Sequence, residues 1–503
     1  MVPHFPVMVV LGCGLVFAGG DFHFQLGRVL APVQRTELDG AEIAAYVPSR
    51  DEFLVTTGDK GVSALPVTAG AKASVTSYNG EVASVAAHGD LVAVPEMGVP
   101  HTLPGSVHLY QFRAGDARFP SLVKTYPTCA HPDMITFTPD GSKILVACEG
   151  EIDAETRADP EGAIGVIDLS RGVASGVSVS LGFGGFDSLA LAKRGVRLAG
   201  PGNFKQNIEP EYIAVAPDGR TAWATLQEND AVARIDLVRK KITDIFPLGA
   251  VDHSKPGNEF DYRQDGRISL ENAPLRGLRQ PDGIAALTAN GRNYFFTANE
   301  GAPREYPFYT DVTTAAALSQ AGKLDAKVFT PELVRSMGAL PVSSMEPCAE
   351  GAPPCRSLNV FGGRSLSVFD GTTGKLVFDS GSMLERMLAK NVPSRFNQND
   401  KKEKHKMDAR SDDKGSEPET VTLGKVDGHT LAFLGLERAG GIVVWDVTRP
   451  ESPEIIDYII DDRDRGPEGV LFVPAEKSAG HRPLLAVGYE YSRTFVVYTV
   501  SFP

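Results

Sequence analysis

Apolar and polar positions in this chain follow a unit that recurs seven times. In each unit an acidic residue precedes an apolar run, and a second apolar run ends about 15 to 22 residues later at another acid. A third apolar run follows, as at 163–169, 231–237, 365–370 and 441–447. A repeat of about four strands is typical of a β-propeller blade. The paired acids are Glu42 and Asp59, Glu81 and Glu96, Asp133 and Glu149, Glu211 and Glu228, Asp282 and Glu300, Glu419 and Glu437, and Glu468 and Glu490.

The sequence therefore predicts an all-β fold, a single seven-bladed β-propeller over residues 21–503. The unit is clearest at Asp133–Phe137, which predicts a strand, followed by a Pro-Asp-Gly turn and a returning strand at Lys143–Cys148. Both acids then fall at the same end of the hairpin. Because the first strand of a propeller blade is innermost, we expect these acids to surround one end of the axial channel.

The ends of the chain and two irregular stretches complete the predicted architecture. The last unit lacks a strand, and Phe22–Val29 is predicted to supply it, which removes an exposed sheet edge. Two long loop insertions are expected at 301–362, with a helix near Pro331–Met337, and at 386–416. The charged run Asn397–Lys406 favours a mobile, solvated loop. A lid over the channel mouth is the alternative for both insertions, because they adjoin ring acids.

Composition and cysteines restrict the partners and the compartment. The formal net charge of −13 argues against nucleic acid and for cations or cationic surfaces. Residues 1–20 resemble a signal peptide, with a buried strand as the alternative. Cys129 and Cys148 bracket a predicted hairpin, and Cys348 and Cys355 share one loop, so two disulfides or free thiols are expected. These features together predict a secreted or cell-surface (extracellular or periplasmic) protein.

Carboxylates crowded at one end of a channel repel one another unless cations or hydrogen bonds compensate them. Hard oxygen ligands of this kind suit Ca²⁺, with another divalent metal as a second choice. The alternative is that each acid caps backbone N–H groups or pairs with an Arg. Three basic residues near the motifs, Arg304, Lys414 and Arg438, are candidates for ion-pair partners or for a catalytic phosphate clamp. The candidate metal ligands are Asp133, Glu149, Glu211, Glu228, Asp282, Glu300, Glu419, Glu437 and Glu468.

Several of these motifs resemble those of the choice-of-anchor I domain family, whose members include a mesenchyme-specific cell-surface glycoprotein and bacterial proteins described as atypical alkaline phosphatases. The more distinctive stretches are Ser-Asp-Asp-Lys-Gly at 411–415 and Leu-Glu-Arg-Ala-Gly-Gly at 436–441; Gln-Pro-Asp-Gly-Ile at 280–284 and Ala-Asn-Glu-Gly at 298–301 also match. The resemblance covers the chain from about residue 80 onward. It implies a secreted or surface-attached seven-bladed propeller, and it leaves the activity open.

Two functions follow from this pattern. One is a metal-dependent phosphomonoesterase acting outside the cell, in which channel carboxylates hold Ca²⁺ and a basic residue neutralises a small phosphorylated substrate. The other is a non-catalytic module that handles calcium or mineral, or that binds a surface or matrix protein. A purely structural propeller is a third reading. The sequence contains no G-x-S-x-G, H-E-x-x-H or P-loop motif, so no familiar nucleophile motif favours catalysis.

Overall fold

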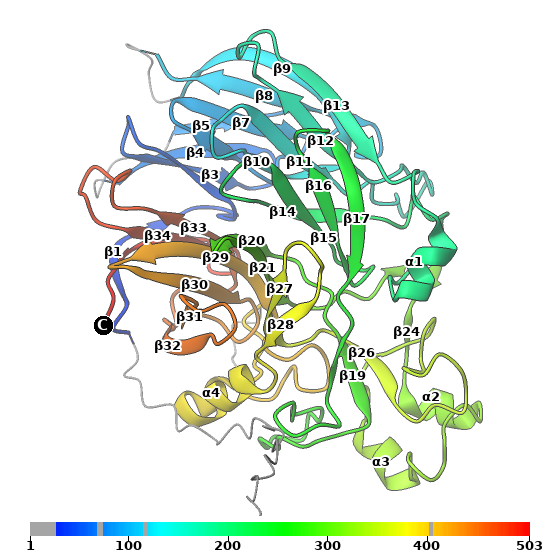
Figure 1. The fold of residues 1–503 in the computed structure, drawn as a ribbon. Coiled ribbons are helices and arrows are strands. Elements are labelled where there is room, and N and C mark those ends of the chain that lie inside the picture. Colours follow the sequence, from blue (N-terminus) through cyan, green and yellow to red (C-terminus); the bar gives the residue numbers. More distant parts are fainter. Residues whose placement is uncertain (1–26, 68–73, 114–118, 402–405) are drawn as a thin grey trace, which may run out of the picture.

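The computed structural model describes residues 27–67, 74–113, 119–401 and 406–503 (Figure 1). The segment predicted as a signal peptide, 1–20, lies outside these residues. Among the described helices, none has both the length and the apolar character needed to cross a membrane.

The described chain contains seven four-stranded antiparallel sheets, which confirms the predicted all-β fold. Within six of them the strands run in chain order from the inside outward. The innermost strands are β2 (Ala44–Val47), β6 (Ala86–His88), β10 (Pro132–Phe137), β14 (Pro210–Val215), β20 (Ile284–Ala289), β29 (Pro418–Val426) and β33 (Pro467–Val473). The second strands are β3 (Glu52–Thr57), β7 (Leu91–Glu96), β11 (Lys143–Cys148), β15 (Thr221–Leu226), β21 (Arg292–Asn299), β30 (His429–Leu436) and β34 (Leu484–Tyr489). The third strands are β4 (Gly61–Pro66), β8 (Pro104–Gln111), β12 (Ala163–Asp168), β16 (Ala231–Asp236), β27 (Ser365–Asp370), β31 (Ile442–Asp446) and β35 (Thr494–Val500). The outer strands are β5 (Ser74–Ser77), β9 (Ser121–Ala130), β13 (Val177–Gly182), β17 (Lys241–Pro247), β28 (Leu376–Asp379), β32 (Glu454–Ile459) and β1 (Leu30–Glu37).

The seven sheets form a ring. Each innermost strand contacts the innermost strand of the next sheet, and β33 of the last sheet contacts β2 of the first. Residues on or beside all seven of these strands line a central cavity of about 510 Å³. Neighbouring sheets pack face to face through aromatic and aliphatic side chains. For example, the Trp223 ring of β15 lies 6.1 Å from the Phe295 ring of β21 in the next sheet.

The last sheet is completed by the N-terminal strand β1, which pairs antiparallel with β35. An N-terminal closing strand is present, at Leu30–Glu37. Of the predicted segment Phe22–Val29, residues 22–26 lie outside the described part of the chain, and 27–29 precede the strand. The paired segment contains Pro32, and its register shifts between Pro32 and Gln34. Proline lacks the N–H that a ladder needs and is tolerated on an outer strand. The apolar alternation at 30–37 is weak, so the sequence did not indicate this strand.

The stretch 301–362 lies between β21 and β27 and is folded, not an open loop. It carries β22 (Glu305–Tyr306), β23 (Tyr309–Thr310), β24 (Val312–Thr313), α2 (Ala315–Gln320), α3 (Pro331–Ser336), β25 (Val342–Ser343) and β26 (Leu358–Phe361). Three of these strands join β18 (Ala250–Asp252) and β19 (Leu275–Leu278) in a five-stranded side sheet, in which β19 and β26 are parallel. The side sheet and α2 and α3 enclose a separate apolar core.

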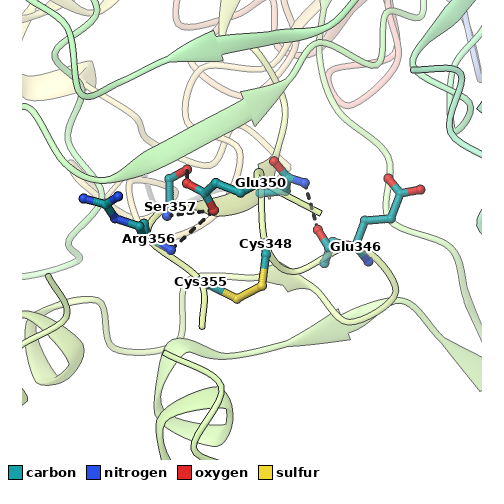
Figure 2. The surroundings of a disulfide bond; sticks show 8 residues. Glu346, Cys348, Glu350, Cys355, Arg356 and Ser357 are labelled. Carbon is teal, nitrogen blue, oxygen red and sulfur yellow. Dashed lines mark hydrogen bonds between the residues drawn. A yellow bond between two sulfur atoms is a disulfide. The ribbon is translucent and has the colours of Figure 1, made fainter. Parts of the chain in front are cut away.

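A disulfide between Cys348 and Cys355 closes a tight loop in this insertion (Figure 2). Figure 2 shows the Glu350 carboxylate accepting hydrogen bonds from the backbone N–H groups of Arg356 and Ser357 across that loop. The second disulfide joins Cys129 to Cys148, whose Cα atoms are 5.8 Å apart. Both expected pairings are therefore present.

A second irregular stretch connects β28 to β29 and includes α4 (Met383–Asn391) and the short helix η1 (Pro393–Arg395). The sequence favours a solvated loop at Asn397–Lys406, but the side chains of Asn397, Gln398 and Asp400 are fully buried. Gln398 donates to the carbonyl of Ala439, and Asn397 donates to the Glu385 carboxylate. The start of the charged run is therefore part of the core. One further helix, α1 (Ser188–Arg194), follows β13.

Candidate functional site

Four opening acids occupy β-bulges where the innermost strands begin. In β10 the pairing of Pro132 with Cys148 is followed by a register shift, and the same shift follows the first proline of β14, β29 and β33. A bulge bends the strand and redirects its side chains. The recurring Pro-acid pair thus has a local structural cause. The four acids are Asp133, Glu211, Glu419 and Glu468.

Carboxylates from neighbouring sheets approach one another within ligand distance of a common ion. One oxygen from each of Asp133, Glu149 and Glu211 lies within 4.8 Å of the other two. These acids come from the third and fourth sheets, so the trio spans two blades. Two more trios have the same spacing: Glu300, Glu417 and Glu437, and Glu437, Glu468 and Glu490.

Burial and mutual repulsion raise the pKa of many of these carboxyl groups. Burial, together with Glu81 and Glu151, raises the pKa of Asp133 to about 6. Burial, followed by Glu490, raises the pKa of Glu42 to about 7. Burial and the nearby acids also raise the pKa values well above the ordinary range for Glu149, Glu211, Asp282, Glu419 and Glu468.

Electrostatic influence links these trios to the remaining predicted ligands, and we call the nine predicted ligands the acid ring. Glu419 is influenced by Glu300, Glu437, Glu468 and Asp282, which belong to three sheets. Asp133 contributes to the raised pKa of Asp282 after burial and Glu300, although the two acids belong to sheets that are not adjacent. The Tyr212 side chain lines the central cavity, and its pKa is raised by burial and by Asp282, Asp133 and Glu468. Tyr212 therefore lies between the cavity and the acid ring.

The three predicted basic residues also lie at the ring, and each is engaged by carboxylates. The Lys414 amine pairs with Glu300 and, at 3.0 Å, with Glu417. The Arg438 Nε atom lies 3.3 Å from Glu417 and 3.1 Å from Glu437. Arg410 pairs with Glu417 as well. Although burial opposes it, these three cations lower the pKa of Glu417 to about 2.

Arg304 is the third predicted base and is almost fully buried. Its guanidinium lies 2.6 Å from a Glu209 oxygen and 3.7 Å from a Glu228 oxygen, and it donates to the carbonyl of Asn207. Of the two roles expected for Arg304, Lys414 and Arg438, the geometry favours that of ion-pair partners.

Basic side chains neutralise the carboxylates of the acid ring on one side more than on the other. Within the described part of the chain, no Lys or Arg side chain forms an ion pair with Asp133, Glu149 or Glu211. The same holds for Asp282, Glu419 and Glu468. The Oε2 atom of Glu419 is buried without a hydrogen-bond partner in the described residues, in a side chain that is 9% exposed. This part of the ring matches the donor chemistry of a hard divalent cation.

Comparison with known proteins places the chain in a family. A model of the choice-of-anchor I domain matches residues 42–450. The chain belongs to the choice-of-anchor I domain family. Among curated proteins, this choice-of-anchor I chain is 26% identical over 297 residues to the mesenchyme-specific cell surface glycoprotein of Strongylocentrotus purpuratus, covering 52% of this chain and 38% of that protein. It is also 34% identical over 88 residues to Gigasin-3a of Magallana gigas, covering 17% of this chain and 31% of that protein.

Solved structures resemble this choice-of-anchor I chain only loosely. The Kuenenia stuttgartiensis hydrazine synthase matches with a TM-score of 0.48 and 12% identity, over 93% of this chain and 98% of the other. The β-propeller domain of Cps50 (Swd1) from Myceliophteria thermophila matches with a TM-score of 0.47 and 9% identity, over 94% and 100%. The propeller assignment accordingly rests on the sheet topology of the chain itself.

The sequence analysis of the choice-of-anchor I chain did not identify the glutamates that form ion pairs with Arg304 and Lys414. Glu209 and Glu417 each precede the proline of a Pro-Glu pair, in the motif Glu-Pro-Glu at 209–211 and 417–419. In both copies the first Glu binds a basic residue, whereas the second belongs to the acid ring and forms no ion pair with a described Lys or Arg. The repeated Glu-Pro-Glu motif was the available signal. Gln227, which donates to Glu300 at 2.7 Å, and Tyr491, which donates to Glu437, carried no such signal.

Proposed function

We propose that this propeller binds divalent cations, Ca²⁺ in preference, on its acid ring and acts outside the cell as a non-catalytic binding module. The observation that carries this proposal is the trio of Asp133, Glu149 and Glu211, three converging carboxylates with no Lys or Arg ion pair in the described chain. Burial raises the electrostatic cost of ionising them together. A bound cation removes that cost, and its remaining ligands would be water or backbone oxygens, because Ca²⁺ takes six to eight oxygens.

The unpartnered Oε2 atom of Glu419 supports the same proposal from another part of the ring. A buried carboxylate oxygen without a hydrogen bond is destabilising unless something binds it. Glu419 lies near Asp282 and Glu468, and these two also form no ion pair with a described basic side chain. This second group of acids is a further place where a hard cation would be stabilised.

Calcium titration by calorimetry tests the proposal with matched variants. We expect the wild type to bind Ca²⁺ and the double variant Asp133→Asn/Glu211→Gln to bind it at least about 10-fold more weakly, a loss of about 1.4 kcal/mol. Glu332→Gln, on an exposed helix, is the control and is expected to leave the affinity unchanged. The proposal fails if the wild type takes up no divalent cation, or if the double variant binds Ca²⁺ like the wild type.

The extracellular location rests on independent features. Two disulfides favour an oxidising compartment. The family match and the cell-surface name of the Strongylocentrotus purpuratus relative agree with that compartment. Partners suited to an acidic, calcium-loaded face are mineral surfaces and surface or matrix proteins.

The phosphomonoesterase hypothesis stays a prediction. A phosphate clamp needs a cationic side chain that substrate can reach, whereas Lys414, Arg438 and Arg304 are each paired with glutamates. Turnover of p-nitrophenyl phosphate with added Ca²⁺ and with EDTA tests it directly. If hydrolysis occurs and both EDTA and Lys414→Met abolish it, the phosphomonoesterase hypothesis replaces the non-catalytic proposal. Absence of hydrolysis with every divalent metal would support the non-catalytic proposal.

A further inference from the structure

Three chain segments converge beside the third sheet and bring two histidines together. His101 lies between β7 and β8, and His131 is the single residue between β9 and β10. The His131 N–H donates to the carbonyl of His101 at 3.2 Å, and the Glu149 N–H donates to the carbonyl of His131 at 3.0 Å. Backbone hydrogen bonds therefore hold all three segments in place.

A disulfide and a sterically restricted glycine also hold the backbone around His131 and Glu149 in place. The Cys129–Cys148 disulfide joins the chain two residues before His131 to the chain one residue before Glu149. Gly150 has φ of +70°, and a Cβ there would lie 2.9 Å from backbone atoms at 161 and 162. Only glycine fits this turn, which separates Glu149 from Glu151.

The side chains at this spot present nitrogen and oxygen ligands to one another. One ligand atom from each of His101, His131 and Glu151 lies within 4.8 Å of the other two. The His131 Nδ1 atom is 3.7 Å from Glu151 Oε2 and 3.3 Å from Glu149 Oε2. His131 Nδ1 and His101 Nε2 are both buried and have no hydrogen-bond partner among the described residues. Glu151 is 45% exposed in its side chain, so the spot is open to solvent on one side.

We propose that His101, His131 and Glu151 form a second metal site, for a divalent transition-metal ion and Zn²⁺ in preference, separate from the calcium site proposed on the acid ring. Imidazole nitrogens suit Zn²⁺ and similar ions, whereas Ca²⁺ takes oxygen ligands. Ligands of a tetrahedral Zn²⁺ lie about 3.3 Å apart at bond lengths near 2.0 Å. The His131–Glu151 distance of 3.7 Å is close to this value, and a ligand atom of His101 lies within 4.8 Å of both. Glu149 borders both sites.

The position of His131 in the repeat is a second argument for a bound cation beside His101 and Glu151. His131 precedes Pro132 as Glu209 precedes Pro210 and Glu417 precedes Pro418. In those two blades the residue at this position binds Arg304 or Lys414. The third sheet offers a histidine with an unpartnered nitrogen at the equivalent place, and no Lys or Arg of the described chain pairs with it.

Cobalt substitution with a matched histidine pair tests the site. His131 and His481 both have φ near +50°, a conformation that Asn tolerates, so His131→Asn and His481→Asn change the same residue type in the same backbone setting. We expect Co²⁺ to give histidine-dependent visible absorption in the wild type and in His481→Asn, to be displaced by Zn²⁺, and to be absent in His131→Asn. Because changes outside the ligands already cost about 10–100-fold in metal affinity, loss of a ligand should cost at least as much.

Glu151→Gln provides a second variant at a partly exposed position, where folding is not at risk. It should weaken Zn²⁺ binding while Ca²⁺ titration stays at the wild-type affinity, which separates this site from the acid ring. The inference is wrong if no Co²⁺ or Zn²⁺ binds. It is also wrong if binding persists in both His131→Asn and Glu151→Gln, or if excess Ca²⁺ displaces the Zn²⁺. If no metal binds, the 3.3 Å approach of His131 Nδ1 to the Glu149 carboxylate is a histidine–carboxylate contact only.

Discussion

Glu417 and Glu419 are two residues apart and have opposite electrostatic surroundings. Glu417 is fully buried among Lys414, Arg410 and Arg438, and its pKa is lowered to about 2. Glu419 is surrounded by other acids, and its pKa is raised. The proline between them starts a bulged strand, so the two side chains serve different parts of the ring. Sequence position alone therefore does not say which acid of the pair is compensated.

At Glu417, substitution by Gln should be strongly destabilising. The change leaves three basic side chains without their shared buried anion, and breaking such a network costs about 3–5 kcal/mol. Urea unfolding followed by circular dichroism measures the loss. Glu332→Gln removes an exposed ion pair with Arg335 and should give no measurable change. Equal midpoints for the two variants would contradict the assigned role of Glu417.

Among the strands and helices, the regular hairpins were predictable and the side sheet was not. The Pro-acid start, the turn at Pro139–Gly141 and the apolar runs identify blade strands because each hairpin is local and half-buried. The side sheet pairs β19 with β26, segments about 80 residues apart that are only four residues long. Strands this short carry no readable periodicity. The ring of acids followed from the repeat, whereas its pairing with bases depends on long-range packing that the repeat does not encode.

The two disulfides are expected to contribute unequally to stability. Cys129–Cys148 closes a separation of 19 residues and Cys348–Cys355 one of 7, and the loss of unfolded-state entropy grows with loop length. A double Ala variant of the first pair should lose about 2–4 kcal/mol and the second pair less. Differential scanning calorimetry of both variants at equal concentration provides the comparison, and a larger melting-temperature loss for the second pair would contradict it.

The strand β1 should be required for a stable last sheet. Without it, β35 becomes an outer edge with unpaired N–H and C=O groups, and Arg35 no longer pairs with Asp461 and Asp464. A chain beginning at residue 38 should therefore aggregate or elute as oligomers in size-exclusion chromatography. Arg35→Ala retains the strand and serves as the control that should remain monodisperse. Monomeric behaviour of the shortened chain would show that β1 is dispensable.

For the whole molecule, charge compensation is concentrated on one part of the acid ring. Glu300, Glu417 and Glu437 share Lys414 and Arg438, and Glu228 lies beside Arg304. The other acids of the ring depend on protonation or on bound cations. The stability of the whole propeller should accordingly depend on pH and on divalent metal together.

Without divalent metal, stability should fall as the pH rises from 6.5 to 8. Carboxyls such as Glu42 and Glu437, with pKa values raised to about 7 and about 8, keep their protons in the folded state longer than in the unfolded chain, so unfolding releases protons in this window. Buried His253, with its pKa lowered to about 4, has the opposite effect only below its ordinary value of 6.5. Ca²⁺ should reduce or reverse the fall, because the ionised carboxylates bind it. Melting temperatures with EDTA and with Ca²⁺ across this range check both trends, and parallel curves would contradict metal linkage.

The parallel pairing of β19 with β26 has a practical consequence for engineering. One partner precedes the fifth blade in the chain and the other lies inside that blade's insertion, so a shortened propeller cannot be made by replacing 301–362 with a brief connector. Such a deletion would strip β19 of its neighbour β26 and open the apolar core of the side sheet. A minimal version would have to remove the 250–278 segment in the same step.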